Sequence, residues 1–180
     1  AKAIAAFERT LITPDTPYDR FVRGEDRALD PAQRRGMSLF ESVGCVLCHR
    51  GPNFSDASVL GGSNPLRYFP ANETAYDRKY GLRGKEGRPG PWRVPSLRNV
   101  ALTGPWLHNG SVDSLDEVVR IMAGAQLGRT GRRANWVSPD GTLSRTDQSV
   151  LPEQDVRDLV AFLKALSSDS LVRAQHGNCK

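Results

Sequence analysis

The sequence has no long hydrophobic run. Its longest apolar stretches, such as residues 3–7, fall far short of the roughly 18 consecutive apolar residues that a membrane-spanning helix needs. We therefore expect no membrane span. No secretory signal is visible, and residue 1 is Ala within a helical pattern, which is typical of a processed protein or of a piece of a longer one.

Long basic runs and nucleic-acid motifs are also missing. The 25 Lys and Arg residues exceed the 20 Asp and Glu residues, but the arginines are scattered, which argues against nucleic-acid binding. An anionic cofactor or an acidic partner protein is a better use of the net charge of +5, because opposite charges steer encounter. The length of 180 residues allows one domain with a substantial core.

Cysteine is scarce, and its odd number excludes an evenly paired disulfide framework. Cys179 lies next to the end of the chain, where we expect a free thiol, whereas Cys45 and Cys48 lie together and His49 follows them. Cys-x-x-Cys-His is the attachment sequence of c-type haem. Two thiols add to the two vinyl groups of the porphyrin, and the adjacent histidine reaches the iron. The sequence predicts one covalently bound haem c.

Two other interpretations of this motif remain open but are less favoured. A thioredoxin-like redox pair would need a βαβ context, which the sequence does not indicate. A zinc site would need a fourth ligand, from His108, His176 or Cys179, but no second Cys-x-x-Cys or His-x₃-His spacing accompanies the motif.

The second axial position of the iron has few candidates, because the chain holds only two methionines and three histidines. Met37 lies in the helix that leads into Cys45, so we expect it to pack in the core. Met122, His108 and His176 remain, and Met122 is favoured. Ligation by His and Met raises the reduction potential and fills both axial positions, which favours electron transfer over activation of an oxidant.

Hydrophobic periodicity predicts four helices, over residues 1–12, 31–43, 114 to about 124–128, and 152–166. We expect Pro14 and Pro17 to end the first. Asp30 caps the second, and Gly44 stops it. A capping box of Ser114 and Glu117 begins the third, and glycines 124 and 128 end it. The apolar stripes are Ile4, Phe7, Leu11 and Ile12; Met37, Phe40 and Val43; Leu115, Val118, Val119 and Met122; and Val156, Leu159, Val160, Leu163 and Leu166.

The segments between these helices are rich in Gly, Pro, Asn and Ser. Residues 51–102 are predicted to form a long loop that wraps a cofactor, and residues 128–150 a surface excursion. The tail after residue 167 is expected to be loose. With no convincing strand, the fold class is all-α with long loops, arranged as a connection over 1–30, a cytochrome c-like haem domain over 31–167 and a polar tail over 168–180.

Several segments together resemble one protein family. In chain order they are residues 6–11 (AFERTL), 45–49 with 51–56 (GPNFSD), 94–103 (VPSLRNVALT), 105–110 (PWLHNG), 121–128 and 158–163 (DLVAFL). The chain resembles the C-terminal haem domain of bacterial di-haem cytochrome c peroxidases, a group that includes the MauG-like enzymes. The resemblance spans nearly the whole chain.

This resemblance implies a role for the axial residues. Cys45 and Cys48 would be the thioether anchors. His49 and Met122 would ligate the iron of the high-potential, electron-accepting haem. MauG-like members have Tyr in place of that Met, so Met122 favours the peroxidase branch.

Other roles are implied by position. Thr103 and Pro105 resemble residues that help to hold a calcium ion between two haem domains. His108 would lie near the haem without binding iron. Arg98 and Asn99 would contact the propionates or the loop that carries them. Trp106 would pack against the haem or serve as a stepping stone for electrons.

The family's enzymes carry two Cys-x-x-Cys-His motifs, and this chain has one. The expected partner is therefore an N-terminal domain with a second, peroxide-reducing haem. A small cytochrome or cupredoxin is the expected electron donor, and the protein is expected to be able to form a homodimer. A periplasmic location follows from haem c attachment, which occurs outside the cytoplasm. The alternatives are a stand-alone mono-haem electron carrier and part of a MauG-like protein-oxidising enzyme.

Overall fold

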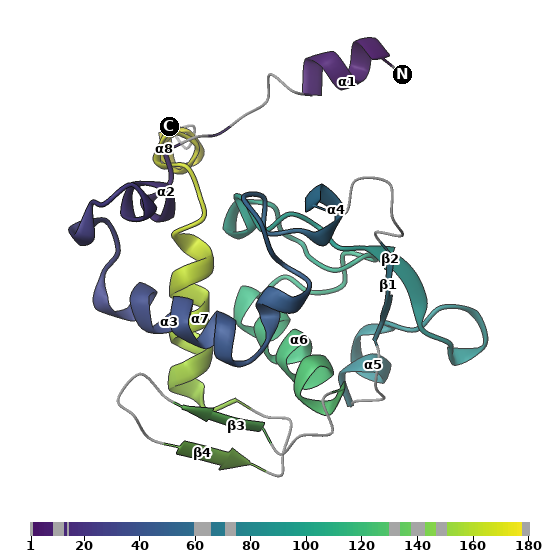
Figure 1. Ribbon diagram of the computed structural model, residues 1–180. Coiled ribbons are helices and arrows are strands. Elements are labelled where there is room, and N and C mark those ends of the chain that lie inside the picture. Colours follow the sequence, from purple (N-terminus) through teal and green to yellow (C-terminus); the bar gives the residue numbers. More distant parts are fainter. Residues whose placement is uncertain are drawn as a thin grey trace.

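The computed structural model describes residues 2–8, 13, 15–59, 66–70, 75–129, 134–137, 143–146 and 151–177 (Figure 1). The longer elements of this part are helices α1 (Lys2–Glu8), α2 (Pro17–Val22), α3 (Pro31–Ser42), α4 (Asp56–Val59), α5 (Ala75–Tyr80), α6 (Leu115–Arg129), α7 (Glu153–Lys164) and α8 (Asp169–Gly177), and strands β1 (Leu66–Phe69), β2 (Gly90–Arg93), β3 (Ala134–Val137) and β4 (Leu143–Thr146). Short 3₁₀ turns span Asp26–Ala28, Cys45–Leu47, Lys85–Gly87 and Val100–Leu102.

Helix α3 begins and ends where the sequence predicts. The Asp30 side chain accepts a hydrogen bond from the Gln33 amide, and the Gln33 side chain accepts one from the Asp30 amide, so two otherwise unpaired donors are satisfied. Pro31 occupies the first turn, where no amide donor is needed. Gly44, at φ 94°, ends this helix and begins the turn that carries Cys45.

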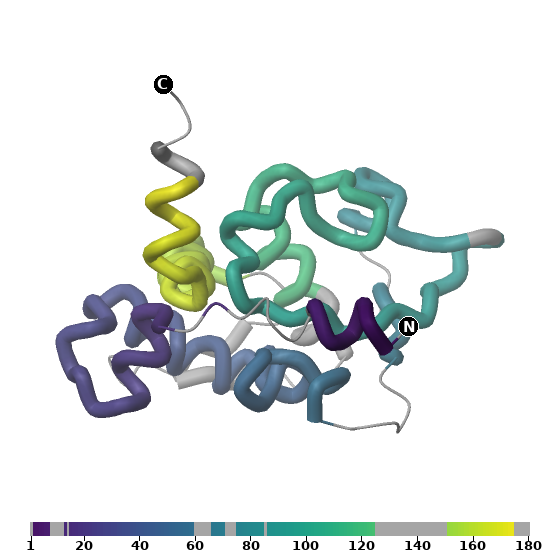
Figure 2. Tube along the Cα trace, turned by 90° about the horizontal axis from the view of Figure 1, so that it is seen from above, coloured from purple at the N-terminus to yellow at the C-terminus, as the bar shows by residue number. Residues whose placement is uncertain are grey.

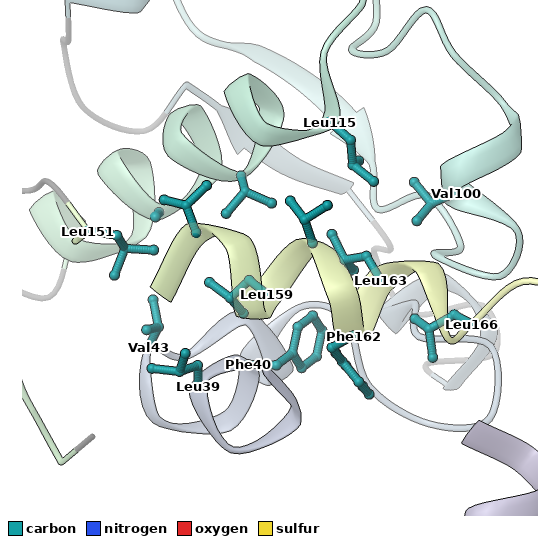
Figure 3. Close-up of a cluster of buried hydrophobic side chains, with 14 of the residues drawn as sticks. Leu39, Phe40, Val43, Val100, Leu115, Leu151, Leu159, Phe162, Leu163 and Leu166 are labelled. Carbon is teal, nitrogen blue, oxygen red and sulfur yellow. The ribbon is translucent and has the colours of Figure 1, made fainter. Parts of the chain in front are cut away.

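Helix α7 lies at the centre of the main core, between α3 and α6 (Figure 3). Its predicted stripe is buried, and Phe40 of α3 packs on Phe162 of α7 with ring centroids 5.4 Å apart. The two helices approach closely at Gly36, where a Cβ atom would lie 1.9 Å from the Asp158 carbonyl oxygen. Beside this contact, Arg35 donates two hydrogen bonds to the Asp158 carboxylate, at 2.7 and 2.8 Å. The fold therefore joins the haem-motif helix tightly to α7.

Helix α6 packs on the other face of α7 through Val119 and Ala123. The Glu117 amide donates to the Ser114 hydroxyl oxygen at 3.4 Å, as the predicted cap requires. The prediction that Gly124 ends this helix was wrong, because α6 continues to Arg129. A glycine inside a helix costs about 1 kcal/mol, which packing along α7 offsets.

The prediction that Pro17 ends a helix was also wrong, because Pro17 begins α2. Thr16 caps this helix, and its side chain exchanges hydrogen bonds with Asp19. Proline suits the first turn of a helix as well as the position after its end, so the residue alone does not distinguish the two. Tyr18 then packs edge-on to Phe54 and Phe162, which fixes α2 against the core.

The fold is mostly helical, but the expectation of an all-α chain was only partly right. Two small antiparallel sheets of two strands each are present in the described residues: β1 pairs with β2, inside the predicted long loop, and β3 pairs with β4, inside the predicted excursion. Helices α4 and α5 also lie within 51–102. Strands of four residues give too little alternation to be distinguished from a loop.

The two ends of the chain are helical. The tail expected to be loose forms α8, which extends away from the end of α7 (Figure 2). Helix α1 confirms part of the first predicted helix, but its Ile4 and Phe7 are each 64% exposed, and residues 9–12 and 14 lie outside the described part. Among the described residues, no helix is long and apolar enough to cross a membrane.

Candidate functional site

The haem motif forms one tight turn directly after α3. Left-handed Gly44 begins the turn, Cys45–Leu47 form a 3₁₀ turn, and the amides of Cys48 and His49 both donate to the Cys45 carbonyl oxygen, at 3.2 and 2.9 Å. Both thiols are free and half-buried. The turn therefore presents two free thiols and an imidazole from five consecutive residues.

The orientation of the His49 ring is set by a backbone carbonyl. Its Nδ1 atom lies 3.1 Å from the Phe54 carbonyl oxygen. A carbonyl only accepts hydrogen bonds, so Nδ1 carries the proton and the lone pair of the neutral ring is on Nε2. Burial lowers the pKa of His49, although the carbonyl groups of Phe54 and Pro95 act in the opposite direction. A neutral imidazole with a free Nε2 lone pair is the form that binds iron.

Phe54 holds that carbonyl in an unusual backbone conformation. Its φ angle is +49°, in the left-handed region that residues other than glycine rarely adopt. Its ring is 6% exposed and packs edge-on to Tyr18, Phe40 and Phe162, with centroids 5.0, 6.0 and 6.2 Å away. The buried ring therefore anchors the residue whose carbonyl meets His49.

The segment 94–98 braces the loop that follows the motif. Arg98 Nε donates to the Pro52 carbonyl oxygen at 2.8 Å, and Ser96 Oγ donates to the Asn53 carbonyl oxygen at 2.8 Å. The buried Ser55 hydroxyl donates in return to the Val94 carbonyl oxygen at 2.7 Å. Arg98, Ser96 and His49 thus each contact one of three consecutive carbonyl oxygens, those of residues 52, 53 and 54 respectively.

Arg98 also reaches back to α2. Its guanidinium pairs with the Asp19 carboxylate at 2.7 Å and lies over the Phe54 ring. Although burial alone would raise the pKa of Asp19, the hydrogen bonds from Arg98 and Thr16 hold it below its ordinary value. Asn99 donates to Thr13 at 2.7 Å and accepts from the Ser168 amide at 3.0 Å. Both residues thus contact the loop after the motif or the chain segments beside it; whether they also meet propionates stays a prediction.

A buried carboxylate joins the motif to strand β1. Asp56 is fully buried, its amide donates to the Cys48 carbonyl oxygen at 2.9 Å, and its carboxylate pairs with Arg50 and Arg67. The loop that leaves His49 is therefore closed back on the motif. Asp56 belongs to the segment 51–56 that carries the family resemblance, but its pairing with Arg50 and Arg67 was not predicted.

A pocket of about 410 Å³ adjoins His49 between α2, α3 and the motif loop. Its walls include Tyr18, Phe40, Phe54 and Phe162, and Met37 also lines it. Met37 packs against the main core cluster, as predicted. Neither Cys45 nor Cys48 lines this pocket. The donor set itself, two free thiols on one turn and an imidazole protonated at Nδ1, fits a covalently attached haem. Burial raises the pKa of Cys45 to about 12, so its thiol stays protonated until it is used.

Met122 lies half-buried on α6, near the middle of the helix. Its neighbours Ile121 and Ala123 belong to the two described core clusters, whereas Met122 is in neither of them and does not line the pocket beside His49. A half-buried methionine outside the core has its thioether available for another partner. Its role as an axial ligand stays a prediction.

The aromatic candidates occupy different environments. Trp106 packs against the main core, and its indole donates to the Val100 carbonyl oxygen at 2.8 Å. His108 is exposed and stacks on Trp92, with centroids 4.1 Å apart and planes 15° apart; partial burial lowers the pKa of His108. Sequence reasoning missed Trp92, which no motif marks out.

The remaining candidates are the two predicted calcium-site residues and the residues near the end of the chain. Thr103 and Pro105 are exposed, and the Thr103 hydroxyl donates to the Val100 carbonyl oxygen at 3.2 Å. Within the described residues, no cluster of three or more His, Cys, Asp or Glu side chains suits a metal ion. The side chain of His176 and the whole of Cys179 lie outside the described part.

Sequence reasoning also missed the residues that set the geometry around His49. Phe54, Ser55, Ser96 and Tyr18 fall in loops and short helices, and Phe54 acts through its backbone. The first three lie in segments that carry the family resemblance, which was the available signal.

Comparison with known proteins relates the chain to haem peroxidases. No family model matches it. The chain is 36% identical to the cytochrome c551 peroxidase of Pseudomonas aeruginosa, covering 93% of this chain and 43% of that protein. It is 38% identical to the cytochrome c peroxidase Ccp of Escherichia coli, covering 92% of this chain and 31% of that protein. The chain thus spans less than half the length of these relatives.

A solved structure gives the same relationship. The crystal structure of a MauG-like protein associated with microbial copper homeostasis matches with a TM-score of 0.61 and 30% identity, over 94% of this chain and 57% of that one. The cytochrome c peroxidases among these relatives imply a haem cofactor. Over more than nine-tenths of its length, the chain is a homologue of the cytochrome c peroxidases and MauG proteins.

Proposed function

We propose that this chain is the electron-accepting c-type haem domain of a di-haem cytochrome c peroxidase. In that role it takes electrons from a small cytochrome or cupredoxin and passes them to a second haem domain, where hydrogen peroxide is reduced to water. The observation that carries the proposal is the Cys45–His49 turn, with its two free thiols and an imidazole whose Nε2 is left for iron.

The chain's own residues have distinct parts in this proposal. Cys45 and Cys48 would hold the porphyrin through thioethers, and His49 and Met122 would ligate the iron. When bound, the haem supplies reversible one-electron chemistry, and the thioether of Met122 raises its potential. Trp106 and His108 are proposed to lie close to the haem, and Arg98 and Asn99 to organise its surroundings.

Charge and location complete the proposal. The excess of basic residues favours an acidic electron donor. The exposed Thr103 and Pro105 offer oxygen atoms, which calcium prefers, at the expected boundary with the second domain. Attachment of haem c takes place outside the cytoplasm, so we infer a periplasmic protein.

Haem count and mass test the proposal directly. We expect the native protein to carry two haems at roughly double the 19.8 kDa of this chain, and the haem on this chain to resist acidified acetone. The chain alone should be reduced by a donor yet turn over peroxide poorly. A single haem on a native protein of this size would instead support a mono-haem electron carrier. A colourless product, or haem that acidified acetone extracts, would refute covalent attachment.

The likeness to a MauG-like protein favours a second candidate, oxidation of a partner protein. Met122 argues against it, since the family resemblance associates that branch with a tyrosine at this position. Turnover with peroxide and a reduced cytochrome separates the two, because a protein-oxidising enzyme would not need the cytochrome as its electron source.

A further inference from the structure

The loop after the haem motif presents the strained Phe54 carbonyl to His49 Nδ1, and the Pro95 carbonyl also lies beside this ring. The carbonyls of Pro52, Asn53 and Phe54 accept from Arg98 Nε, Ser96 Oγ and His49 Nδ1 respectively. Three consecutive carbonyls with three side-chain donors are far from the usual pattern, in which loop carbonyls bind water or other backbone groups. Each donor fixes one peptide plane of the loop.

The conformation of Phe54 needs such support. A left-handed backbone is unfavourable for a residue other than glycine, and it persists only where its surroundings determine it. Backbone amides fix one side of this loop, because the amides of Phe54, Ser55 and Asp56 donate to Gly51, Arg50 and Cys48. The donors from Ser96 and Arg98 fix the carbonyl side.

We propose that Ser96 and Arg98 are positioning residues that hold the Phe54 carbonyl on His49 and so set the reduction potential of the haem. This inference rests on the proposed function, since it needs iron on His49. A firm hydrogen bond from Nδ1 to a carbonyl makes the imidazole a stronger electron donor and favours ferric iron. The clamp formed by Ser96 and Arg98 thus keeps the potential below the value that the same two axial ligands would give with a loose carbonyl.

Arg98 is suited to this role because it spans three elements. One guanidinium nitrogen binds Pro52 of the motif loop, another binds Asp19 of α2, and the plane covers the Phe54 ring. Lysine would keep the charge beside Asp19 but has no fork to reach both partners. Ser96 is exposed, so its removal disturbs the Asn53 carbonyl without opening the core.

The test compares the double variant Ser96→Ala/Arg98→Lys with the control Ser111→Ala/Arg93→Lys, in the haem-loaded full chain. Ser111 and Arg93 are exposed, and neither side chain has a described hydrogen bond or ion pair, so the control repeats the chemical changes away from the clamp. We expect the double variant to keep its haem and to have a higher reduction potential. If the double variant loses a factor of ten in its preference for ferric over ferrous iron, its reduction potential rises by 59 mV, because the couple transfers one electron.

A second readout follows the hydrogen bond itself. In the diamagnetic ferrous protein, the His49 Nδ1 proton should exchange with solvent at least tenfold faster in the double variant than in the control. If the double variant fails to fold, Ser96→Ala alone is compared with Ser111→Ala. Haem-loaded variants with the potential and exchange rate of their controls would overturn the clamp while leaving the proposed function intact. Absence of haem from the wild-type chain would instead refute the proposed function.

Discussion

Replacing Gly36 by alanine tests the crossing that carries the haem-motif helix. A Cβ atom at residue 36 would lie 1.9 Å from the Asp158 carbonyl oxygen and 2.8 Å from the Phe162 Cβ atom. Normal contact is about 3.5 Å, so α3 would have to move from α7 by roughly 1.5 Å. Without this contact, alanine would stabilise the helix by about 1 kcal/mol.

The two effects have opposite signs, so the sign of the measured change decides between them. Overpacking of a core typically costs about 1–3 kcal/mol, and an approach of 1.9 Å that also strains the Arg35–Asp158 pair and the Phe40–Phe162 contact puts the cost at the upper end, about 3 kcal/mol, against the gain of about 1 kcal/mol. We expect a net loss of about 2 kcal/mol, or roughly 4–8 °C in Tm for a chain of this size.

Denaturant unfolding of the haem-loaded chain measures the loss. Ser38→Ala, on the exposed face of the same helix, is the control and should change stability by less than about 0.5 kcal/mol. Because α3 leads directly into Cys45, Gly36→Ala should also lower the fraction of chains that carry haem. A Gly36→Ala protein as stable as wild type would refute the close crossing.

Three further predictions concern the site and its supports. Met122→Ala should open one axial position, and should therefore lower the reduction potential and convert low-spin to high-spin iron; an absorption spectrum and potential equal to those of wild type would contradict ligation by Met122. Cys48→Ala should still hold haem through one thioether in acidified acetone, whereas Cys45→Ala/Cys48→Ala should release it, and retention by the double variant would contradict covalent attachment. The lowered pKa of Asp19 means that its pair with Arg98 stabilises the fold at neutral pH and loses this effect as pH falls below about 4 and through the lowered pKa. Asp19→Asn should therefore be less stable than wild type at pH 7, by about 1 kcal/mol for this partly exposed pair, and the difference should shrink in urea melts at pH 3; a pH-independent difference would contradict the ion pair.

The elements that the sequence predicted well are those with local causes. Asp30 and Gly44 determine the ends of α3 through bonds to residues within one turn, so the printed sequence contains the whole cause. The stripe on α7 is equally local, because helical periodicity alone places Val156, Leu159 and Leu163 on one buried face.

The errors arose where the cause is distant or ambiguous. Pro17 suits either end of a helix, and the contact of Tyr18 with Phe54 and Phe162, which favours α2 here, is not visible in a sequence window. Gly124 would end an isolated helix, but α6 packs along α7. The two small sheets were missed because their strands are only four residues long.

The candidate site divides in the same way. Cys45, Cys48 and His49 are recognisable from spacing alone, because the attachment chemistry involves five consecutive residues. The geometry of His49 is different, since it depends on a backbone carbonyl and on donors 43 and 46 residues distant from their acceptors. No residue type marks such an arrangement.

This division explains why the resemblance over residues 94–103 is informative beyond the haem motif itself. A short turn can present two thiols and an imidazole, but nothing within it holds the His49 ring against the Phe54 carbonyl. In the proposal made above, that orientation also depends on Ser96 and Arg98, and Arg98 is in turn held by Asp19 on α2. Haem attachment would then be a local property of the motif, whereas control of the iron's potential would be a property of three segments brought together by the fold.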